Sequence, residues 1–179
     1  MNDYYKQKQI IAACDKAGKI LGPIEKWEAH KKGILHRAFT VAFVFDGQLV
    51  IQHRKHPAFD GVFDITSSSH QLFENGKLQD TSEAILDTIE REWELNRSDV
   101  KKLTDNGQVY YKAKDAKSEF YEHEVCDVFV AEITRFPLPK LDVAYGVSFI
   151  DPKDLKNKKS RIYENLAPWV IAAIEQDKL

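Results

Sequence analysis

One short segment constrains the fold more than any other. In TVAFVFDGQLVIQ, residues 40–52, two apolar runs meet at Asp46-Gly47. An Asp-Gly pair readily adopts the two positive φ angles of a type I′ turn, and such turns join neighbouring antiparallel strands. The segment therefore predicts a β-hairpin. Similar apolar runs predict further strands over residues 10–15, 19–27, 108–113, 125–133 and 145–150, with one short strand within residues 59–70.

The clearest helix is predicted over residues 81–95. Ile85, Ile89 and Trp93 recur every four residues there, which is the pattern of an amphipathic helix with one buried stripe. Glu92 lies at the edge of that stripe, so its carboxylate is expected to face the interior. Trp93 is expected in the core.

The rest of the chain supplies shorter elements. Asp151-Pro152 has the form of an N-cap followed by proline in the first turn of a helix. Strands around two or three helices indicate an α+β or mixed α/β sandwich. The remaining assignments are a polar lead-in over residues 1–8, a loop over residues 72–80 and a last helix over residues 168–176.

Composition limits the classes of function. The 179 residues suit one domain, residues 1–179, and the formal net charge of −2 gives no overall attraction to nucleic acid or to a membrane surface. The two cysteines, Cys14 and Cys126, give no disulfide framework, and Cys126 is expected to be a small buried residue. Without a signal-peptide pattern, the cytoplasm is the expected location. The oligomeric state is left open.

Five side chains form a candidate metal site. Residues 28–39 carry two histidines six residues apart, SSSH ends in a third, and EHEVC carries two glutamates that alternate along a strand and so share a face. Three imidazoles and two carboxylates suit Mn²⁺, Zn²⁺ or Fe²⁺. The predicted ligands are His30, His36, His70, Glu122 and Glu124, whereas the other histidines, His53, His56 and His123, are expected to be ordinary polar residues.

The order of these features resembles the Nudix superfamily and, within it, the type 1 isopentenyl diphosphate isomerases. The resemblance runs from about residue 10 to about residue 175. Its parts are EAH, LHRAF, the Asp-Gly hairpin, Arg54-Lys55, GVF, the loop ending at His70, the helix, YKA, EHEVC and Pro168-Trp169. It implies a mixed β-sheet flanked by helices, an α/β/α sandwich. An N-terminal hairpin, about residues 9–27, precedes a core of about residues 30–176 that ends in a C-terminal helix.

The resemblance also implies roles for the side chains. The five predicted ligands match the metal ligands of the family, and Glu92 matches the glutamate that contacts Mg²⁺ bound with the substrate diphosphate. Glu124 would also serve as a metal-bound acid or base beside Tyr111. The diphosphate-binding positions are Lys26, Arg54 and Lys55, although His56 could align in place of Lys55. Tyr111 and Trp169 match the aromatic pair beside the reacting carbon skeleton, where a π face can stabilise a cation; Trp169 fits a core anchor equally well.

Two positions depart from the family pattern. Ser68 stands where the isomerases have a cysteine, and Thr88 stands where they have an arginine that contacts phosphate. A thiol exchanges a proton near neutral pH far more easily than a hydroxyl. Ser68 could still relay a proton, but isomerase activity is expected to be severely reduced or absent.

Three functions therefore stay open. The first is an isomerase-like, metal-dependent enzyme acting on a small prenyl diphosphate. The second is a divergent Nudix hydrolase of an organic or nucleoside diphosphate, although Leu95 and Asn96 occupy positions where the hydrolase motif needs adjacent glutamates. The third is a catalytically silent diphosphate-binding module. In each case the expected partner is a small-molecule diphosphate, with no nucleic acid and no membrane.

Overall fold

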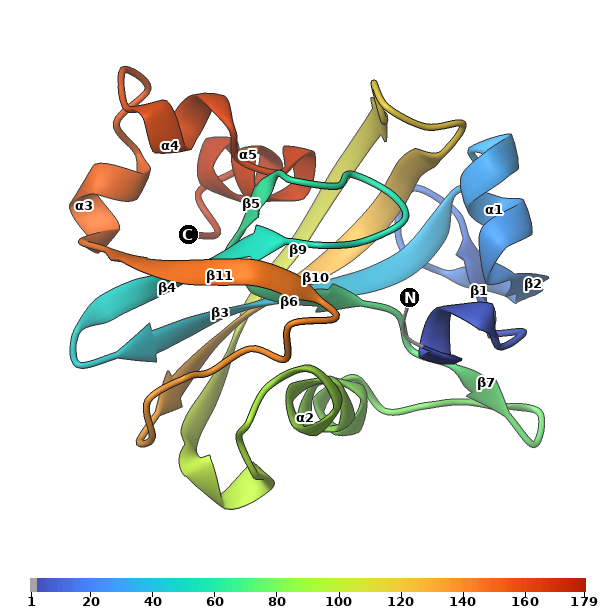
Figure 1. The fold of residues 1–179 in the computed structure, drawn as a ribbon. Helices are drawn as coiled ribbons and strands as arrows, with labels where there is room; N and C mark the ends of the chain where they lie inside the picture. Colours follow the sequence, from blue (N-terminus) through green and yellow to red (C-terminus); the bar gives the residue numbers. More distant parts are fainter. Residues whose placement is uncertain (1–2) are drawn as a thin grey trace.

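A computed structural model describes residues 3–179; residues 1 and 2 of the predicted polar lead-in lie outside the described residues. Helices cover both faces of a mixed sheet, with α2 below it and α3, α4 and α5 above it (Figure 1). The strands are β1 (Ile10–Cys14), β2 (Ile20–Glu25), β3 (His36–Phe45), β4 (Gln48–Arg54), β5 (Phe63–Asp64), β6 (Thr66–Ser69), β7 (Phe73–Glu74), β8 (Lys77–Leu78), β9 (Val100–Lys114), β10 (Tyr121–Ile133) and β11 (Ala144–Ile150). The helices are η1 (Asp3–Lys6), α1 (Lys26–Lys32), α2 (Thr81–Glu92), η2 (Arg97–Asp99), α3 (Pro152–Leu155), α4 (Arg161–Glu164) and α5 (Pro168–Glu175). This is the predicted α/β/α sandwich.

β3 is the central strand. It pairs in parallel with β10 along one side, and β10 in turn pairs with β9. Its other side pairs in succession with β1, β6 and β4. Segments distant in sequence therefore meet at one strand, and this arrangement places the candidate site residues.

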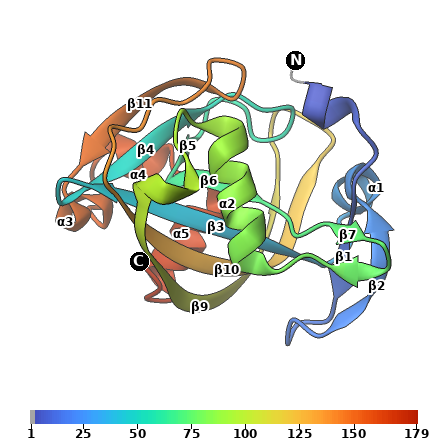
Figure 2. The ribbon, with the colours of Figure 1, turned by 90° about the horizontal axis from the view of Figure 1, so that it is seen from below.

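Alternation along the strands produces two cores. Ala38 and Ala42 of β3 face α5, where they join a cluster that includes Trp169 and Val170. Phe39, Val41 and Phe43 of β3 face α2 and pack with its apolar stripe, and Figure 2 shows α2 lying across that face. Successive strand residues point to opposite sides, so a strand buried on both faces reads as a continuous apolar run.

The Asp-Gly hairpin is confirmed. Asp46 and Gly47 have φ angles of 48° and 76°, and they connect β3 to β4 as a type I′ turn requires. The strands predicted at the N-terminus, over residues 145–150 and within residues 108–133 are also present, with β9 beginning earlier, at Val100. The helix after Asp151 is present with its cap, because the Asp151 side chain accepts from the backbone N–H of Lys153.

Helix α1 was not predicted. The second strand was expected to reach residue 27, but it ends at Glu25, whose carboxylate caps α1 by accepting from the N–H groups of Trp27 and Glu28. Gly33 ends the helix in the left-handed region, with φ 60°, which is the usual place for glycine after a helix. Lys31, Lys32 and Gly33 thus form the C-terminal end of α1.

Three other segments also differ from the prediction. Residues 66–69 are strand β6 rather than loop, because they pair with β3 and Thr66 donates to the carbonyl of Val41. The loop over residues 72–80 contains the small β7–β8 hairpin. α2 ends at Glu92, and Trp93 continues in extended conformation so that its indole N–H reaches Ser67 Oγ at 2.8 Å. The short helix α4 also went unpredicted. None of the helices in residues 3–179 has the length and apolar character needed to cross a membrane.

Trp93 is expected to be a main support of the α2 face. Its side chain is almost fully buried, contacts Phe43 and donates to Ser67. Replacing Trp93 with alanine leaves a cavity and an unpartnered hydroxyl, so the free energy of unfolding should fall by about 3–5 kcal/mol. Urea denaturation followed by circular dichroism measures this loss. Leu141→Ala, at an exposed side chain, is the control and should change the free energy by no more than about 0.5 kcal/mol.

Candidate active site

Five metal-ligating side chains from four elements converge at the start of β3. One nitrogen or oxygen atom from each of the five lies within 4.8 Å of the others. β3 and β10 pair with His36 opposite Glu124, and Glu122 shares the face of Glu124 because the two are two positions apart on the strand. The members of this metal-ligand cluster are His30 on α1, His36 on β3, His70 after β6, and Glu122 and Glu124 on β10.

The imidazoles are oriented by the backbone. Nδ1 of His30 lies 2.7 Å from the carbonyl of Lys26, and Nδ1 of His36 lies 2.7 Å from the carbonyl of Ile34. These carbonyls can only accept, so each Nδ1 carries a proton, and each Nε2 is the nitrogen that faces the carboxylates and, in the neutral ring, offers a lone pair to a metal ion. A metal ion needs this tautomer.

Separations between the ligand atoms also fit a shared ion. Nε2 of His30 lies 3.2 Å from Glu122 Oε2, and Nε2 of His36 lies 3.3 Å from Glu124 Oε1. Within residues 3–179, neither His36 Nε2 nor Glu122 Oε2 makes a hydrogen bond although both are buried. Buried polar atoms normally have partners, so atoms aimed at a common point without one fit a divalent cation that accepts mixed nitrogen and oxygen ligands.

Protonation states favour the same conclusion. Burial raises the pKa of Glu124, but contacts with His36, Glu122 and Tyr111 outweigh it and bring the pKa to about 2, so the group is ionised at neutral pH. Burial, with Lys26 and His36 nearby, holds the pKa of His70 well below its usual value. A neutral imidazole beside an ionised carboxylate is a competent pair of ligands.

Next to these ligands lies a cationic cluster of Lys26, Arg54 and Arg91. The first two line the same pocket as the metal-ligand cluster, and Arg91 lines an adjoining hollow that shares His70 with it. Burial, then Arg91 and Arg54, lower the pKa of Lys26 to about 8, whereas Glu122 and Glu92 oppose this shift. Like charges gathered in a buried place mark a site for an anion.

Aromatic rings of η1 cover this cationic cluster. Tyr4 lies over the guanidinium of Arg91 at 3.9 Å, and the ammonium of Lys26 lies 5.6 Å from the ring centre of Tyr5. Tyr5 also packs edge-on against His56 at 4.6 Å. Cation–π contacts of this kind hold cations in place, and the rings occupy the approach that a bound anion would need.

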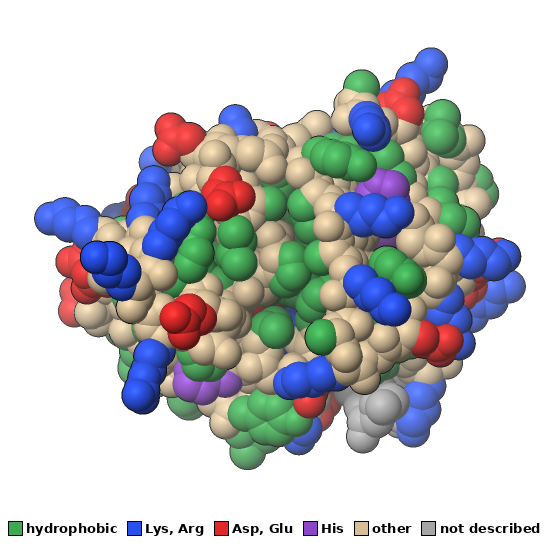
Figure 3. Space-filling view, turned by 90° about the horizontal axis from the view of Figure 1, so that it is seen from above, with side chains coloured by type: hydrophobic (Ala, Val, Ile, Leu, Met, Phe, Trp, Pro, Cys, Tyr) green, Lys and Arg blue, Asp and Glu red, His purple; other side chains and the backbone are tan. Residues whose placement is uncertain are grey.

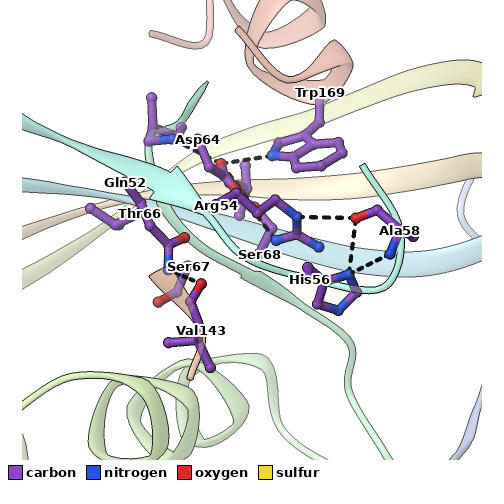
Figure 4. Close-up of polar contacts among 12 residues, drawn as sticks. Gln52, Arg54, His56, Ala58, Asp64, Thr66, Ser67, Ser68, Val143 and Trp169 are labelled. Atoms are coloured by element: carbon purple, nitrogen blue, oxygen red, sulfur yellow. Dashed lines mark hydrogen bonds and ion pairs between the residues drawn. The ribbon is translucent and has the colours of Figure 1, made fainter. Parts of the chain in front are cut away.

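The opposite wall of the pocket is aromatic and acidic. The Tyr111 hydroxyl donates to Glu124, and its ring lies 6.4 Å from that of Trp169. Trp169 packs in the core, and its indole N–H donates to Asp64 Oδ1 at 2.8 Å (Figure 4). Its side chain is therefore both a core anchor and a pocket wall. Ser68 is half-buried and lines the pocket.

Two predicted positions lie elsewhere. Glu92 is buried as expected, and its carboxylate accepts from Arg91 at 2.9 Å; it lies outside the pocket lining and apart from the five-residue cluster, and its predicted contact with Mg²⁺ bound to a diphosphate stays a prediction. The Lys55 ammonium donates to the Leu141 carbonyl at 2.9 Å and is absent from the pocket lining, whereas His56 is half-buried and lines the pocket. His56 is thus the member of the pair beside Arg54 that contacts the site. His53 and His123 bond to Ser148 and Tyr110 outside the pocket, as ordinary polar residues.

Two site residues were missed by the sequence analysis. Arg91 follows Thr88 by one helical turn, a spacing that places both on one face of α2, and this was the available signal. Asp64 lies four residues before Ser68 in a strand-like stretch, and no local pattern marks it as buried. Only the packing of α5 over β5 reveals its role.

Comparison with known proteins gives a consistent picture. No family model matches the chain. The isopentenyl-diphosphate Delta-isomerase of Cereibacter sphaeroides is 30% identical over 156 residues, which cover 84% of this chain and 82% of that protein. The enzymes of the same name from Jannaschia sp. and Agromyces mediolanus are 29% and 26% identical over 84% and 91% of this chain, and over 83% and 78% of their own lengths.

Solved structures share the fold. The Deinococcus radiodurans protein DR0079 superimposes with a TM-score of 0.65 at 14% identity, over 94% of this chain and 98% of its own. A MutT Nudix hydrolase from Burkholderia pseudomallei gives a TM-score of 0.57 at 19% identity, over 79% and 97%. At these identities the likeness establishes the Nudix fold and nothing about the substrate.

The metal-ligand cluster is expected to hold a tightly bound divalent cation. Elemental analysis of the purified chain after incubation with Mn²⁺ or Zn²⁺ should find about one metal ion per chain. Glu122→Gln with Glu124→Gln removes both negative ligands and should lower occupancy at least tenfold.

Glu132→Gln is the control, because Glu132 lies further along β10 and pairs with Lys101 at 3.7 Å. It should retain the metal. Equal metal content in the double variant and the control would contradict the assignment of the five ligands.

Proposed function

Since the chain belongs to the isopentenyl-diphosphate Delta-isomerase family of the Nudix superfamily, we propose that this enzyme moves the double bond of a small prenyl diphosphate. The observation that carries the proposal is one pocket whose walls combine four members of the metal-ligand cluster, two members of the cationic cluster, and Tyr111 with Trp169. A diphosphate joined to a short alkene has a matching division into an anionic end and an apolar end.

The cationic cluster would bind the diphosphate. The net charge of −2 gives no overall attraction for an anion, and on the face drawn in Figure 3 lysine and arginine side chains are interspersed with acidic and apolar ones. Lys26 and Arg54 are instead nearly buried, where a charge–charge contact is less screened than in water. Mg²⁺ bound with the diphosphate would be held near Glu92.

Arg91 is proposed to take over the phosphate contact of the arginine that Thr88 replaces. Its Nη2 donates to Thr88 Oγ1 at 3.0 Å, so the guanidinium lies over the position of the replaced residue. Arg91 Nε is buried and makes no hydrogen bond within residues 3–179. A guanidinium with a free donor suits an incoming phosphate oxygen.

The alkene would lie between Glu124 with Tyr111 on one side and Ser68 on the other. Protonating an alkene leaves a tertiary cation, and the faces of Tyr111 and Trp169 can stabilise it. The bound divalent cation would supply charge stabilisation at Glu124 and fix its orientation. The short Tyr111–Glu124 hydrogen bond positions the carboxylate toward the pocket.

Helix α2 favours isomerase chemistry over ordinary Nudix hydrolysis. Only Glu92 among its neighbouring glutamates is buried; Glu90 and Glu94 are exposed, and Glu90 pairs with Arg97. Leu95 is buried in the α2-side core. A single inward carboxylate on the helix does not form the crowded acidic site that metal-activated hydrolysis of a diphosphate needs.

The test of the function is conversion of isopentenyl diphosphate into its isomer with an internal double bond, followed by nuclear magnetic resonance in heavy water. The metal-loaded chain should form the isomer and exchange substrate hydrogen for deuterium. Release of inorganic phosphate or monophosphate in place of isomer would favour the hydrolase. No turnover of isopentenyl diphosphate would contradict the proposal.

Arg91→Ala should raise KM for the diphosphate at least tenfold, because one charge-assisted contact contributes about 1.5–3 kcal/mol. Arg91→Lys keeps the charge without the fork geometry, so its KM should lie between those of the wild type and Arg91→Ala. Arg135→Ala removes an exposed arginine and should leave KM unchanged. Steady-state kinetics of the three variants decide the point. An unchanged KM in Arg91→Ala would remove Arg91 from the binding site.

A further inference from the structure

Behind the pocket wall lies a buried carboxyl group that the proposed function leaves unused: Asp64 contacts Arg54, Ser68 and Trp169, which line the pocket. Asp64 ends β5 and is fully buried. Its Oδ1 accepts from the indole N–H of Trp169 and the backbone N–H of Ile65, both at 2.8 Å, and from the hydroxyl of Ser68 at 3.2 Å. Its Oδ2 lies 3.4 Å from Nη1 of Arg54. Figure 4 shows the side chains of Arg54, Ser68 and Trp169 around this carboxyl group.

The hydrogen bonds of Ser68 give its hydroxyl a direction. A hydroxyl has one hydrogen to donate and two lone pairs that can accept. Ser68 donates to Asp64, so Thr40 Oγ1, 2.8 Å from Ser68 Oγ, is the donor of that second hydrogen bond. One lone pair of Ser68 remains, and Ser68 lines the pocket. The oxygen is thus arranged to accept a proton on the pocket side while its own hydrogen points at a carboxylate.

We propose that Asp64 is the proton acceptor behind Ser68: the Ser68 oxygen takes the proton that leaves the substrate, and the Ser68 hydrogen passes to Asp64. This inference rests on the proposed isomerase function. Asp64 would supply the acid–base capacity of the missing cysteine thiol. Because Asp64 is buried behind Ser68, it acts through that hydroxyl and does not contact the substrate.

The proton and electron transfers of this step balance. The proton held between the Tyr111 hydroxyl and Glu124 adds to the terminal CH₂ carbon: its O–H bond breaks and the two π electrons form the new C–H bond, which leaves a cation at the tertiary carbon. A C–H bond of the neighbouring CH₂ then breaks. The proton of that bond goes to the Ser68 oxygen, and the Ser68 hydrogen goes to Asp64. The electron pair of the broken C–H bond forms the new double bond. Asp64 becomes a neutral acid, and solvent exchange resets both sides before the next turnover.

The surroundings of Asp64 suit this role. Four groups face it: Arg54 from β4, Ser68 from β6, Trp169 from α5 and Cys126 from β10. Burial raises the pKa of Asp64, and Arg54 with the hydrogen bonds opposes this only in part, so the pKa is about 6. Such a carboxyl group can accept and release a proton near neutral pH. Burial keeps the pKa of the Cys126 thiol well above its usual value, so that thiol stays protonated.

A purely structural role for Asp64, as an anchor for Arg54 and Trp169, makes different predictions. Asp64→Asn keeps the size of the side chain and an oxygen that can accept from Trp169, but it cannot take up a proton. The decisive readout is therefore the pH profile of kcat, which loss of an anchor alone would not change in shape.

The experiment measures isomerisation of isopentenyl diphosphate by the metal-loaded, full-length chain between pH 5 and pH 8. Wild-type kcat should rise with pH and reach half its maximum near pH 6, because Asp64 must be ionised to accept a proton. Asp64→Asn should lower kcat by about a hundredfold or more, with KM little changed and that midpoint lost. Asp127→Asn, at a buried carboxylate that pairs with Arg37, should keep the midpoint.

Two variants of Ser68 complete the test. Ser68→Ala removes the relay in a half-buried position and should lower kcat as strongly as Asp64→Asn. Ser68→Cys supplies a thiol that exchanges protons unaided, so adding Asp64→Asn to that variant should lower kcat far less than it does in the wild type. Unchanged kcat and pH profile in Asp64→Asn, or full activity in Ser68→Ala, would overturn the role of Asp64 and leave the isomerase function standing. Absence of turnover in the wild type would instead overturn both.

Discussion

The site depends on the register between β3 and β10. These strands run in parallel with His36 opposite Glu124 and Ala38 opposite Cys126, and β6 pairs with β3 so that Ser68 lies opposite Thr40. A shift of one residue would turn every one of these side chains to the other face of the sheet. The continuous apolar character of both strands, buried between α2 and α5, holds this register, since each face must match its own core. The metal-ligand cluster is thus a consequence of how the two cores are packed.

Buried charge is the main energetic problem of this arrangement. Glu122, Glu124 and His30 on one side, and Lys26 and Arg54 on the other, lie almost entirely out of water, and an isolated buried charge costs several kcal/mol. The two groups offset each other in part, as the opposing effects of Glu122 and Arg91 on the pKa of Lys26 show. A divalent cation would complete the neutralisation of the carboxylates, and a diphosphate that of the cationic cluster. Ligands that bind only the folded chain stabilise it, so metal and substrate are expected to strengthen the fold as well as supply the chemistry.

The sequence could predict what depends on local pattern. The Asp46-Gly47 turn, the stripe of α2 and the cap at Asp151 each carry their signal within a few residues, and the order of motifs pointed to the five side chains that the fold brings together. Tertiary packing decided the rest. Residues 66–69 are polar, yet they form a strand because β3 offers them partners and Trp93 needs an acceptor. Lys55 and His56 are adjacent, and only the path of the loop after β4 places one of them on the pocket wall. Arg91 and Asp64 become visible only when distant elements meet.

The two departures from the family pattern have the same physical form. Thr88 is smaller than the arginine that the resemblance implies at its position, and its hydroxyl accepts from Arg91, one turn further along α2. Ser68 is a weaker acid than the cysteine that the resemblance implies at its position, and its hydroxyl donates to Asp64. In each case a neighbouring side chain offers a group of similar chemistry. Arg91 offers a guanidinium in place of a guanidinium, and Asp64 offers a carboxyl group of raised pKa in place of a thiol. A charged side chain in the interior costs free energy unless it is paired or binds a ligand. A pocket that had lost its function would therefore be expected to lose such buried charges. Retention of both pairs therefore favours a pocket that still acts on a diphosphate over one that has decayed.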